Sequence, residues 1–382
     1  MKYFLNSSRP KIVLFFLFII FLIFYLINFD YLTNLFATDY YNRYKPNGIN
    51  LIKNIVHLNF DKINIFNNFL IPEFITGFLL YFYPNEKIFS VVLNIVNIFF
   101  LFFSIYFFIK RLNYKNNNLI LFFLFFLIYS GNWIYCFYKL PDVIFLFFFS
   151  LIFYSLFVAF ETNNKNYFFI SIILAFISLW VRPQGVICIS LVILCYFIYF
   201  FKLKNLINFC FFVFLVYFII FPFLIFFLTK FNINGFLNKV VLNYIDGNIY
   251  FSLHYYYQEF LSDFDFNDNL FSKVIYLYFL FIKKIFYQLI FIRETYSLKH
   301  NMFLIIYAGS IYWAFFFNAK KLYLRYRNFT FILLLTTVLS LLFHGSVALS
   351  AEPNRYHLFH LVPTYLLIIT VYTDYIKRLM DI

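Results

Sequence analysis

The chain has 382 residues, of which 64% are hydrophobic and only 12% are charged, and its mean hydropathy is +0.83. This apolar content exceeds what one globular core can bury, so the composition excludes a soluble protein. Thirty Lys and Arg against sixteen Asp and Glu give a net charge of +14. In a membrane protein this excess is expected in the cytoplasmic loops and not on a surface that binds nucleic acid. We therefore predict an all-α, polytopic membrane protein with one integral domain over residues 1–382 and no nucleic-acid partner.

About ten apolar runs are predicted to be transmembrane helices, because a helix needs roughly 20 residues to cross the hydrocarbon core. The predicted spans lie near 12–29, 88–109, 119–137, 143–160, 167–181, 184–201, 206–229, 301–318, 329–349 and 357–376. The first run follows three basic residues and carries no small-residue cleavage site. We therefore expect it to be an uncleaved first span and not a signal peptide.

Two further apolar stretches are predicted to lie in the membrane interface as helices that do not cross it. Residues 68–84 are short and are interrupted by Glu73, a proline and a glycine. Residues 273–293 carry Lys283 and Lys284 at their centre. A charge in the middle of a crossing helix costs about 2.5–3.5 kcal/mol on insertion scales, whereas a lysine in the interface reaches water.

The distribution of basic residues predicts the orientation of the bundle. With the N-terminus inside, four short joints are cytoplasmic and together hold ten Lys and Arg: 110–118, 161–166, 202–205 and 319–328. Three short joints on the opposite side hold only three: 138–142, 182–183 and 350–356. This asymmetry satisfies the positive-inside rule. The two long segments, 30–87 and 230–300, are then predicted to be extracytoplasmic.

Five ionisable residues near predicted span ends fall on the extracytoplasmic side: Asp39, Asp142, Arg182, Glu352 and Arg355. A charged group at the edge of a bundle is costly unless it is paired or faces a water-filled cavity. We therefore expect a polar cavity that opens on this face of the protein.

Asp39, in "ATDYYNRY", follows the first span by about ten residues. A short loop after a membrane span holds a carboxylate near the bilayer surface, where a base acting on a lipid-linked substrate would have to lie. The alternative is an ordinary solvated loop acid. Asp142 follows Pro141 at a predicted helix start, so it is a candidate for helix capping as well as for supporting a substrate site.

Arg182, in "LWVRPQG", is a candidate phosphate ligand, because a guanidinium donates two parallel hydrogen bonds. Its alternative role is to anchor a helix in the interface. Glu352, Arg355 and Tyr356 precede the last predicted span in "SAEPNRYHLFHLVP" and complete the predicted substrate-binding set. Glu352 and Arg355 are also spaced so that they can pair with each other.

The sequence supports no metal site and no cofactor. His357 and His360 share a helix face, but no third ligand accompanies them. The four cysteines show no CxxC spacing, so we infer neither a disulfide nor a zinc site.

Taken in order, these features resemble the C-type glycosyltransferases, multi-span enzymes that use polyprenyl-phosphate-linked sugars and include the protein mannosyltransferase and aminoarabinose transferase relatives. The resemblance covers most of the chain and rests on "TDYYNRY", "IPEFITGFLLYFYP", "RPQG" and "RYHLFHLVP". By this resemblance Asp39 matches the catalytic acid of the first loop, and Arg182 and Arg355 lie where basic residues near the donor phosphate would be useful. Several relatives have an acidic pair where this chain has a single acid, which leaves a divalent metal open.

The resemblance implies transfer of a sugar to a glycan, lipid or protein acceptor on the extracytoplasmic face of a bacterial inner membrane. Two alternatives stay open. A lipid-linked glycan flippase or transporter would need charges along a path through the spans, and these are almost absent. A lipid-linked glycan polymerase or ligase would share the topology but would not need an acid after the first span.

Overall fold

The computed structural model describes residues 8–112 except 66 and 68, 116–128, 132–202, 208–220 except 218, 297–346 and 353–380, with isolated positions between 272 and 289. Every regular element within these residues is helical, which confirms the all-α prediction for this part of the chain. Four helices are long and apolar enough to cross a membrane: α6 (Glu86–Ile109), α8 (Asp142–Thr162), α15 (Leu298–Phe317) and α17 (Arg327–Ser346). The prediction of a membrane protein is therefore supported by the helices themselves.

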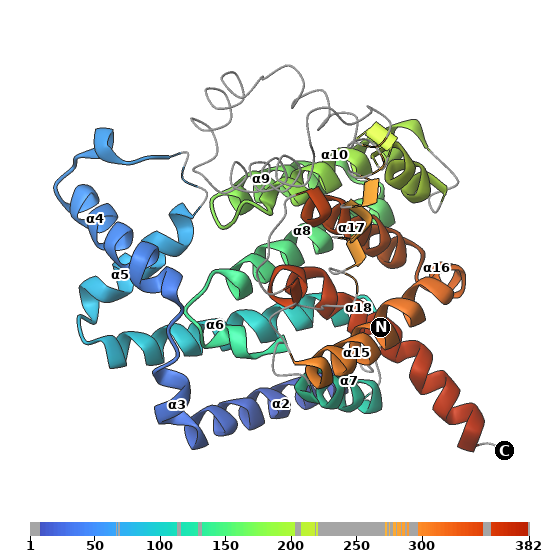
Figure 1. Cartoon of the computed structure of the whole chain (residues 1–382), viewed down its shortest axis with the longest axis horizontal. Helices are drawn as coiled ribbons and strands as arrows, with labels where there is room; N and C mark the ends of the chain where they lie inside the picture. The colour runs from blue at the N-terminus through green and yellow to red at the C-terminus, as the bar shows by residue number, and fades with distance from the viewer. Residues whose placement is uncertain are drawn as a thin grey trace.

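The remaining long helices agree with predicted spans to within a few residues at most ends: α2 (Ser8–Ile27), α9 (Lys165–Leu179), α10 (Gly185–Phe201) and α18 (Pro353–Met380). They pack with α6, α7 (Asn116–Ile128), α8, α15 and α17 around one large hydrophobic core (Figure 1). The predicted span 206–229 is described only over 208–217 and 219–220. Most of the predicted loop 230–300, and most of the interfacial stretch 273–293, lie outside the described residues.

The first long loop is itself helical. It contains α3 (Phe29–Thr33), the π-helical turn Tyr40–Tyr44, α4 (Lys45–Val56), the 3-10 turn Phe60–Lys62 and α5 (Leu70–Phe82). Helices α4 and α5 lie together at one edge of the bundle (Figure 1). A second, smaller hydrophobic core joins this loop to α6 and to the segment 135–140.

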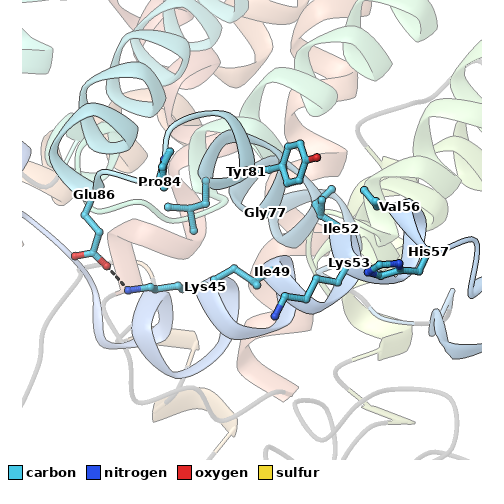
Figure 2. Close-up of a pocket in the computed structure, with 11 residues that line it drawn as sticks. Lys45, Ile49, Ile52, Lys53, Val56, His57, Gly77, Tyr81, Pro84 and Glu86 are labelled. Atoms are coloured by element: carbon cyan, nitrogen blue, oxygen red, sulfur yellow. Dashed lines mark hydrogen bonds and ion pairs between the residues drawn. The ribbon is translucent and has the colours of Figure 1, made fainter.

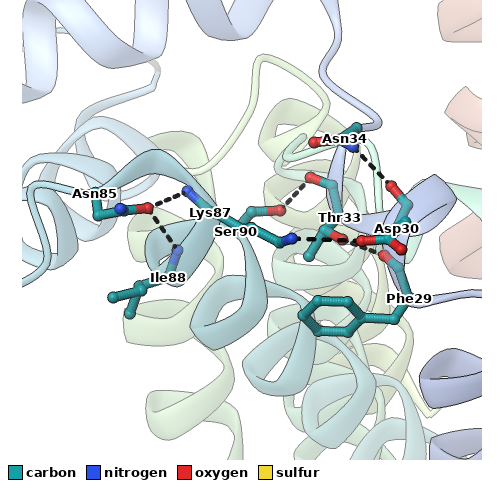
Figure 3. A network of polar contacts seen from close by, with 8 residues as sticks. All are labelled: Phe29, Asp30, Thr33, Asn34, Asn85, Lys87, Ile88 and Ser90. Carbon is teal, nitrogen blue, oxygen red and sulfur yellow. Dashed lines mark hydrogen bonds and ion pairs between the residues drawn. The ribbon is translucent and has the colours of Figure 1, made fainter.

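Helix α3 is fixed to the start of α6 by side chains (Figure 3). The Asn85 side chain caps α6 by accepting from the Lys87 and Ile88 amides at 2.9 and 3.3 Å. Ser90 Oγ donates to the Thr33 carbonyl at 2.5 Å, and Lys87 Nζ lies 3.4 Å from Asp30 Oδ1. The exposed Lys87–Asp30 pair contributes little, so the buried hydrogen bonds of α6 to the end of α3, from Ser90 and from Asn94 to the Leu32 carbonyl, order this junction.

The helix predicted over 119–137 is not continuous: α7 is described over Asn116–Ile128, and the described residues from 132 onward form the 3-10 turn Ile134–Cys136 and further turns. Buried side chains donate to two backbone carbonyls in this region. Asn132 Nδ2 donates to the Phe126 carbonyl at 3.0 Å, and Asn97 Nδ2 donates to the Cys136 carbonyl at 3.0 Å. In a membrane protein, non-helical backbone is tolerated where protein buries it in this way.

The joints that the charge pattern assigns to the extracytoplasmic side contact one another. The Ala37 amide donates to the Tyr138 carbonyl at 3.2 Å, which joins the first loop to the joint 138–142. The Ile71 amide donates to the Trp180 carbonyl at 3.0 Å, and Trp180 Nε1 donates to the Ile65 carbonyl at 2.9 Å. The first loop therefore lies against both the start of α8 and the turn between α9 and α10.

The joints assigned to the cytoplasmic side also meet. Arg111 Nη1 lies 2.7 Å from Glu161 Oε2, and Tyr199 Oη donates to the Asn163 carbonyl at 3.1 Å. The charge pattern divides the joints into two groups, one for each end of the bundle. In both groups, joints of the same group contact each other or the helix ends beside them.

We expect an impermeant maleimide to label Lys62→Cys but not Lys320→Cys in intact cells. Both positions are exposed, and the four natural cysteines are buried, so background labelling should be low. Mass spectrometry of the purified protein measures the outcome, and permeabilised cells, in which both positions react, are the control. Labelling of Lys320→Cys alone would contradict the predicted orientation, and with it the placement of the predicted substrate site on the extracytoplasmic face.

Candidate functional site

The start of α8 and the turn between α9 and α10 are joined by a buried ion pair. Asp142 and Arg182 are 2% and 4% exposed, and Arg182 Nη1 contacts Asp142 Oδ1. Asp142 also lies in the first turn of α8, with Pro141 as the N-cap residue, so its charge faces the positive end of the helix dipole. The structure brings together these two predicted site residues, which are 40 positions apart.

A tight turn holds Arg182 in place. Its amide donates to the Ser178 carbonyl at 3.1 Å, and the Gly185 amide donates to the Arg182 carbonyl at 2.9 Å. A Cβ on Gly185 would lie 2.5 Å from the backbone nitrogen of Leu179, so this position accepts only glycine without a shift of the turn. The "RPQG" motif thus has a structural reason for its glycine.

Three more polar side chains are buried: Gln184, two residues after Arg182, His344 on α17 and His360 on α18. His344 interacts electrostatically with both Arg182 and His360. His344 Nδ1 lies 2.8 Å from the Ser340 carbonyl and 3.2 Å from Ser340 Oγ, which fixes its ring. We call the five residues Asp142, Arg182, Gln184, His344 and His360 the polar core.

Sequence reasoning did not select Gln184 or His344, and it set His360 aside. The available signal was a polar residue inside an otherwise apolar run, as in "LLFHGSV". Gln184 Oε1 is buried and accepts no hydrogen bond from the described residues. A buried acceptor left unsatisfied costs about 1–3 kcal/mol, so this atom marks a place where a polar ligand or a water would be stabilised.

Asp39 is exposed and immediately precedes the π-helical turn Tyr40–Tyr44. The neighbouring Tyr40 is fully buried and anchors the segment. Two residues before Asp39, the Ala37 amide bonds to Tyr138, four residues before Asp142. Asp39 therefore lies on the same end of the bundle as the polar core, joined to it through the 138–142 joint.

Lys139 ties the first loop to this joint. Its Nζ donates to the carbonyls of Phe137, Thr33 and Leu32 at 2.8, 3.1 and 3.2 Å. The three protons of an ammonium match these three acceptors. Its backbone φ of 56° is in the left-handed region, which is unusual for a lysine. Burial lowers the pKa of Lys139 to about 7.

Replacing Lys139 by Met is expected to flatten the pH dependence of stability between pH 7 and 10. The pKa of Lys139 is about 7 in the folded protein against an ordinary value of 10.5, so the unfolded state binds more protons in this window. The contribution of Lys139 to the free energy of unfolding therefore rises with pH there. The measurement is thermal unfolding of wild type and Lys139→Met in detergent over this pH range. The difference between the two proteins at each pH removes the contributions of the other titrating groups, which both proteins share. Parallel curves for the two proteins would contradict the prediction.

A second buried network organises the first loop. Glu73 is 3% exposed and lies at the start of α5. Its Oε1 accepts from Asn47 Nδ2 at 3.1 Å and lies 3.4 Å from Arg43 Nε, and its Oε2 accepts from Asn67 Nδ2. The Arg43 guanidinium lies 4.0 Å from the Phe69 ring. Burial raises the pKa of the Glu73 carboxyl. In the sequence this glutamate only interrupts an apolar stretch, whereas in the structure it links α4 to α5.

The other predicted site residues are described only in part. Arg355 and Tyr356 lie in the first turn of α18, but their side chains are outside the description, and Glu352 lies outside the described residues altogether. His360, farther along α18, belongs to the polar core, so the first turn of α18 is at the same end of the bundle. Within the described ranges, no group of three His, Cys, Asp or Glu could hold a metal ion.

The fold and the polar core define the class of this protein as an all-helical membrane protein with ionised groups buried at one end of its bundle. The chain matches no protein-family model, and it shows no significant similarity to a curated protein or to a solved structure.

Proposed function

We propose that the protein is a membrane glycosyltransferase that moves a sugar from a polyprenyl-phosphate donor to a glycan, lipid or protein acceptor. The observation that carries this proposal is the placement of an exposed carboxylate, Asp39, on the same end of the bundle as the buried Asp142–Arg182 pair. The proposal includes about ten spans, interfacial helices at α5 and at 273–293, and a reaction on the extracytoplasmic face of a bacterial inner membrane.

In the proposed reaction, an acceptor hydroxyl attacks the anomeric carbon of the donor. Asp39 accepts the hydroxyl proton as the new carbon–oxygen bond forms, and the bond from the anomeric carbon to the phosphate oxygen breaks. The polyprenyl phosphate leaves as an anion that needs no proton, only positive charge held in a poorly solvated place. An exposed base fits this role, because the acceptor must reach it from outside the membrane.

Arg182 and Arg355 are the proposed donors of that positive charge, with Glu352 and Tyr356 completing the substrate site. Asp142 contacts a terminal nitrogen of the Arg182 guanidinium, and both side chains are buried. Asp142 therefore acts as a positioning residue that fixes the plane of the guanidinium. The displacement needs no general acid, since the leaving phosphate is already a stable anion.

The experiment that tests this function incubates the purified protein with a synthetic polyprenyl-phosphate sugar and follows release of polyprenyl phosphate. Comparing lipid-linked and surface glycans in cells with and without the gene then identifies the donor, because the unused donor accumulates. Donor consumption by the purified protein supports the transferase. Movement of the lipid-linked glycan across a vesicle membrane without its consumption would instead favour a flippase, and growth of a lipid-linked chain would favour a polymerase or ligase.

A further inference from the structure

The first loop contains a groove that the proposed reaction does not use. It lies between α4 and α5 and has a volume of about 330 Å³ (Figure 2). Its floor is apolar and includes Ile49, Ile52 and Leu80. Its volume is at the lower end of the range for sites that hold a small ligand or part of a larger one.

Close packing of the two helices creates the groove. Gly48 and Gly77 face each other, and a Cβ on Gly77 would meet the Gly48 backbone directly. Near the same crossing, Glu73 on α5 accepts a hydrogen bond from Asn47 on α4, which also holds the two helices together. Because backbone contact fixes the crossing, the two helices hold the apolar floor of the groove in a fixed relative position.

The outer surface of α5 indicates that the groove lies at the membrane. Phe74, Phe78 and Phe82 are 41%, 45% and 58% exposed and follow one another along one helix face. Each ring contacts the next: the ring centroids of Phe74 and Phe78 are 5.8 Å apart, and those of Phe78 and Phe82 are 4.9 Å apart. An exposed aromatic ridge of this kind is stabilised in the acyl region of a bilayer. The groove next to it is then at the level of the lipid headgroups.

Basic side chains border the apolar floor. Lys45, Lys53 and His57 line the groove along α4, and Figure 2 shows them in a row. Lys45 is paired with Glu86. Lys53 and His57 are exposed and are one helical turn apart, so both can reach the same anionic group. An apolar floor with a basic rim is complementary to an amphiphile with a negative head.

We propose that the α4–α5 groove binds an anionic phospholipid of the surrounding bilayer. The lipid phosphate lies between Lys53 and His57, and the first part of an acyl chain lies over Ile49, Ile52 and Leu80. The ammonium and imidazole donors supply charge-assisted hydrogen bonds to the phosphate. This site is independent of the proposed transferase activity, since neither Asp39 nor the polar core contributes to it.

Native mass spectrometry of the detergent-purified protein tests the site, with phosphatidylglycerol as the probe and phosphatidylcholine as the neutral comparison. We expect one phosphatidylglycerol to bind in preference to phosphatidylcholine, and Lys53→Gln with His57→Gln to weaken that binding by about tenfold or more, on the order of one lost charge-assisted hydrogen bond. Both side chains are exposed, so the double variant should keep its fold. Lys62→Gln is the matched control, because it removes an exposed lysine from the same loop without touching the groove.

A second variant tests the floor separately. Ile49→Trp fills the groove while keeping every charge, and it should also lose the bound phosphatidylglycerol. Equal binding of both lipids, or binding unchanged in both variants, would overturn the proposal. Displacement of phosphatidylglycerol by an equal concentration of polyprenyl phosphate would also overturn it, since the groove would then be a donor site.

Discussion

Replacing Asp142 by Asn, or Arg182 by Gln, is expected to destabilise the protein by about 3–5 kcal/mol, because each change leaves one charge buried without its counter-ion. Asp142 and Arg182 are almost inaccessible to water, so neither charge can be solvated in place. The measurement is the free energy of unfolding in mixed micelles, together with protein abundance in the membrane. We expect both quantities to fall in each single variant.

The double variant Asp142→Asn with Arg182→Gln is the matched control. It removes both charges and keeps two side chains that can hydrogen-bond to each other, so its stability should exceed that expected from adding the two single effects. Additive losses would mean that the two residues do not act as a pair. The recovered double variant should still lack transfer activity under the proposed function, because Arg182 is then no longer available to the leaving phosphate.

Replacing Asp39 by Asn is expected to lower the rate of glycosyl transfer by roughly 10²- to 10⁴-fold, the usual contribution of a general base. Asp39 is exposed, so protein abundance and thermal stability should stay at the wild-type level. Turnover of a synthetic polyprenyl-phosphate sugar by the purified variant measures the effect. An unchanged KM with a lower kcat would indicate that the carboxylate acts in the transition state and not in substrate binding.

Asp61→Asn is the matched control for this experiment. Asp61 is also an exposed acid of the first loop, but it lies in the 3-10 turn Phe60–Lys62, away from the contacts with the 138–142 joint. It should retain full activity. Wild-type turnover in Asp39→Asn would remove this residue from the mechanism and favour the flippase or the polymerase.

The amino-acid sequence by itself determined the class of protein and most of the helix boundaries. Long apolar runs dictate helices, because only internal hydrogen bonding satisfies the backbone in lipid. The basic residues grouped the joints into two sets, and contacts such as Ala37 with Tyr138 and Arg111 with Glu161 join members within each set. Composition and charge predict the helices and the grouping of the joints because the bilayer acts on each segment separately.

Only the tertiary structure decided which polar groups meet. Three features depend on partners from distant segments: the pairing of Asp142 with Arg182, the 3-10 turn Ile134–Cys136 and the network around Glu73. No local periodicity encodes such partners, since a buried charge is stabilised by whichever group the packed bundle brings beside it. A glutamate that looks like an interruption of an apolar run is therefore a link between two helices once the chain has folded.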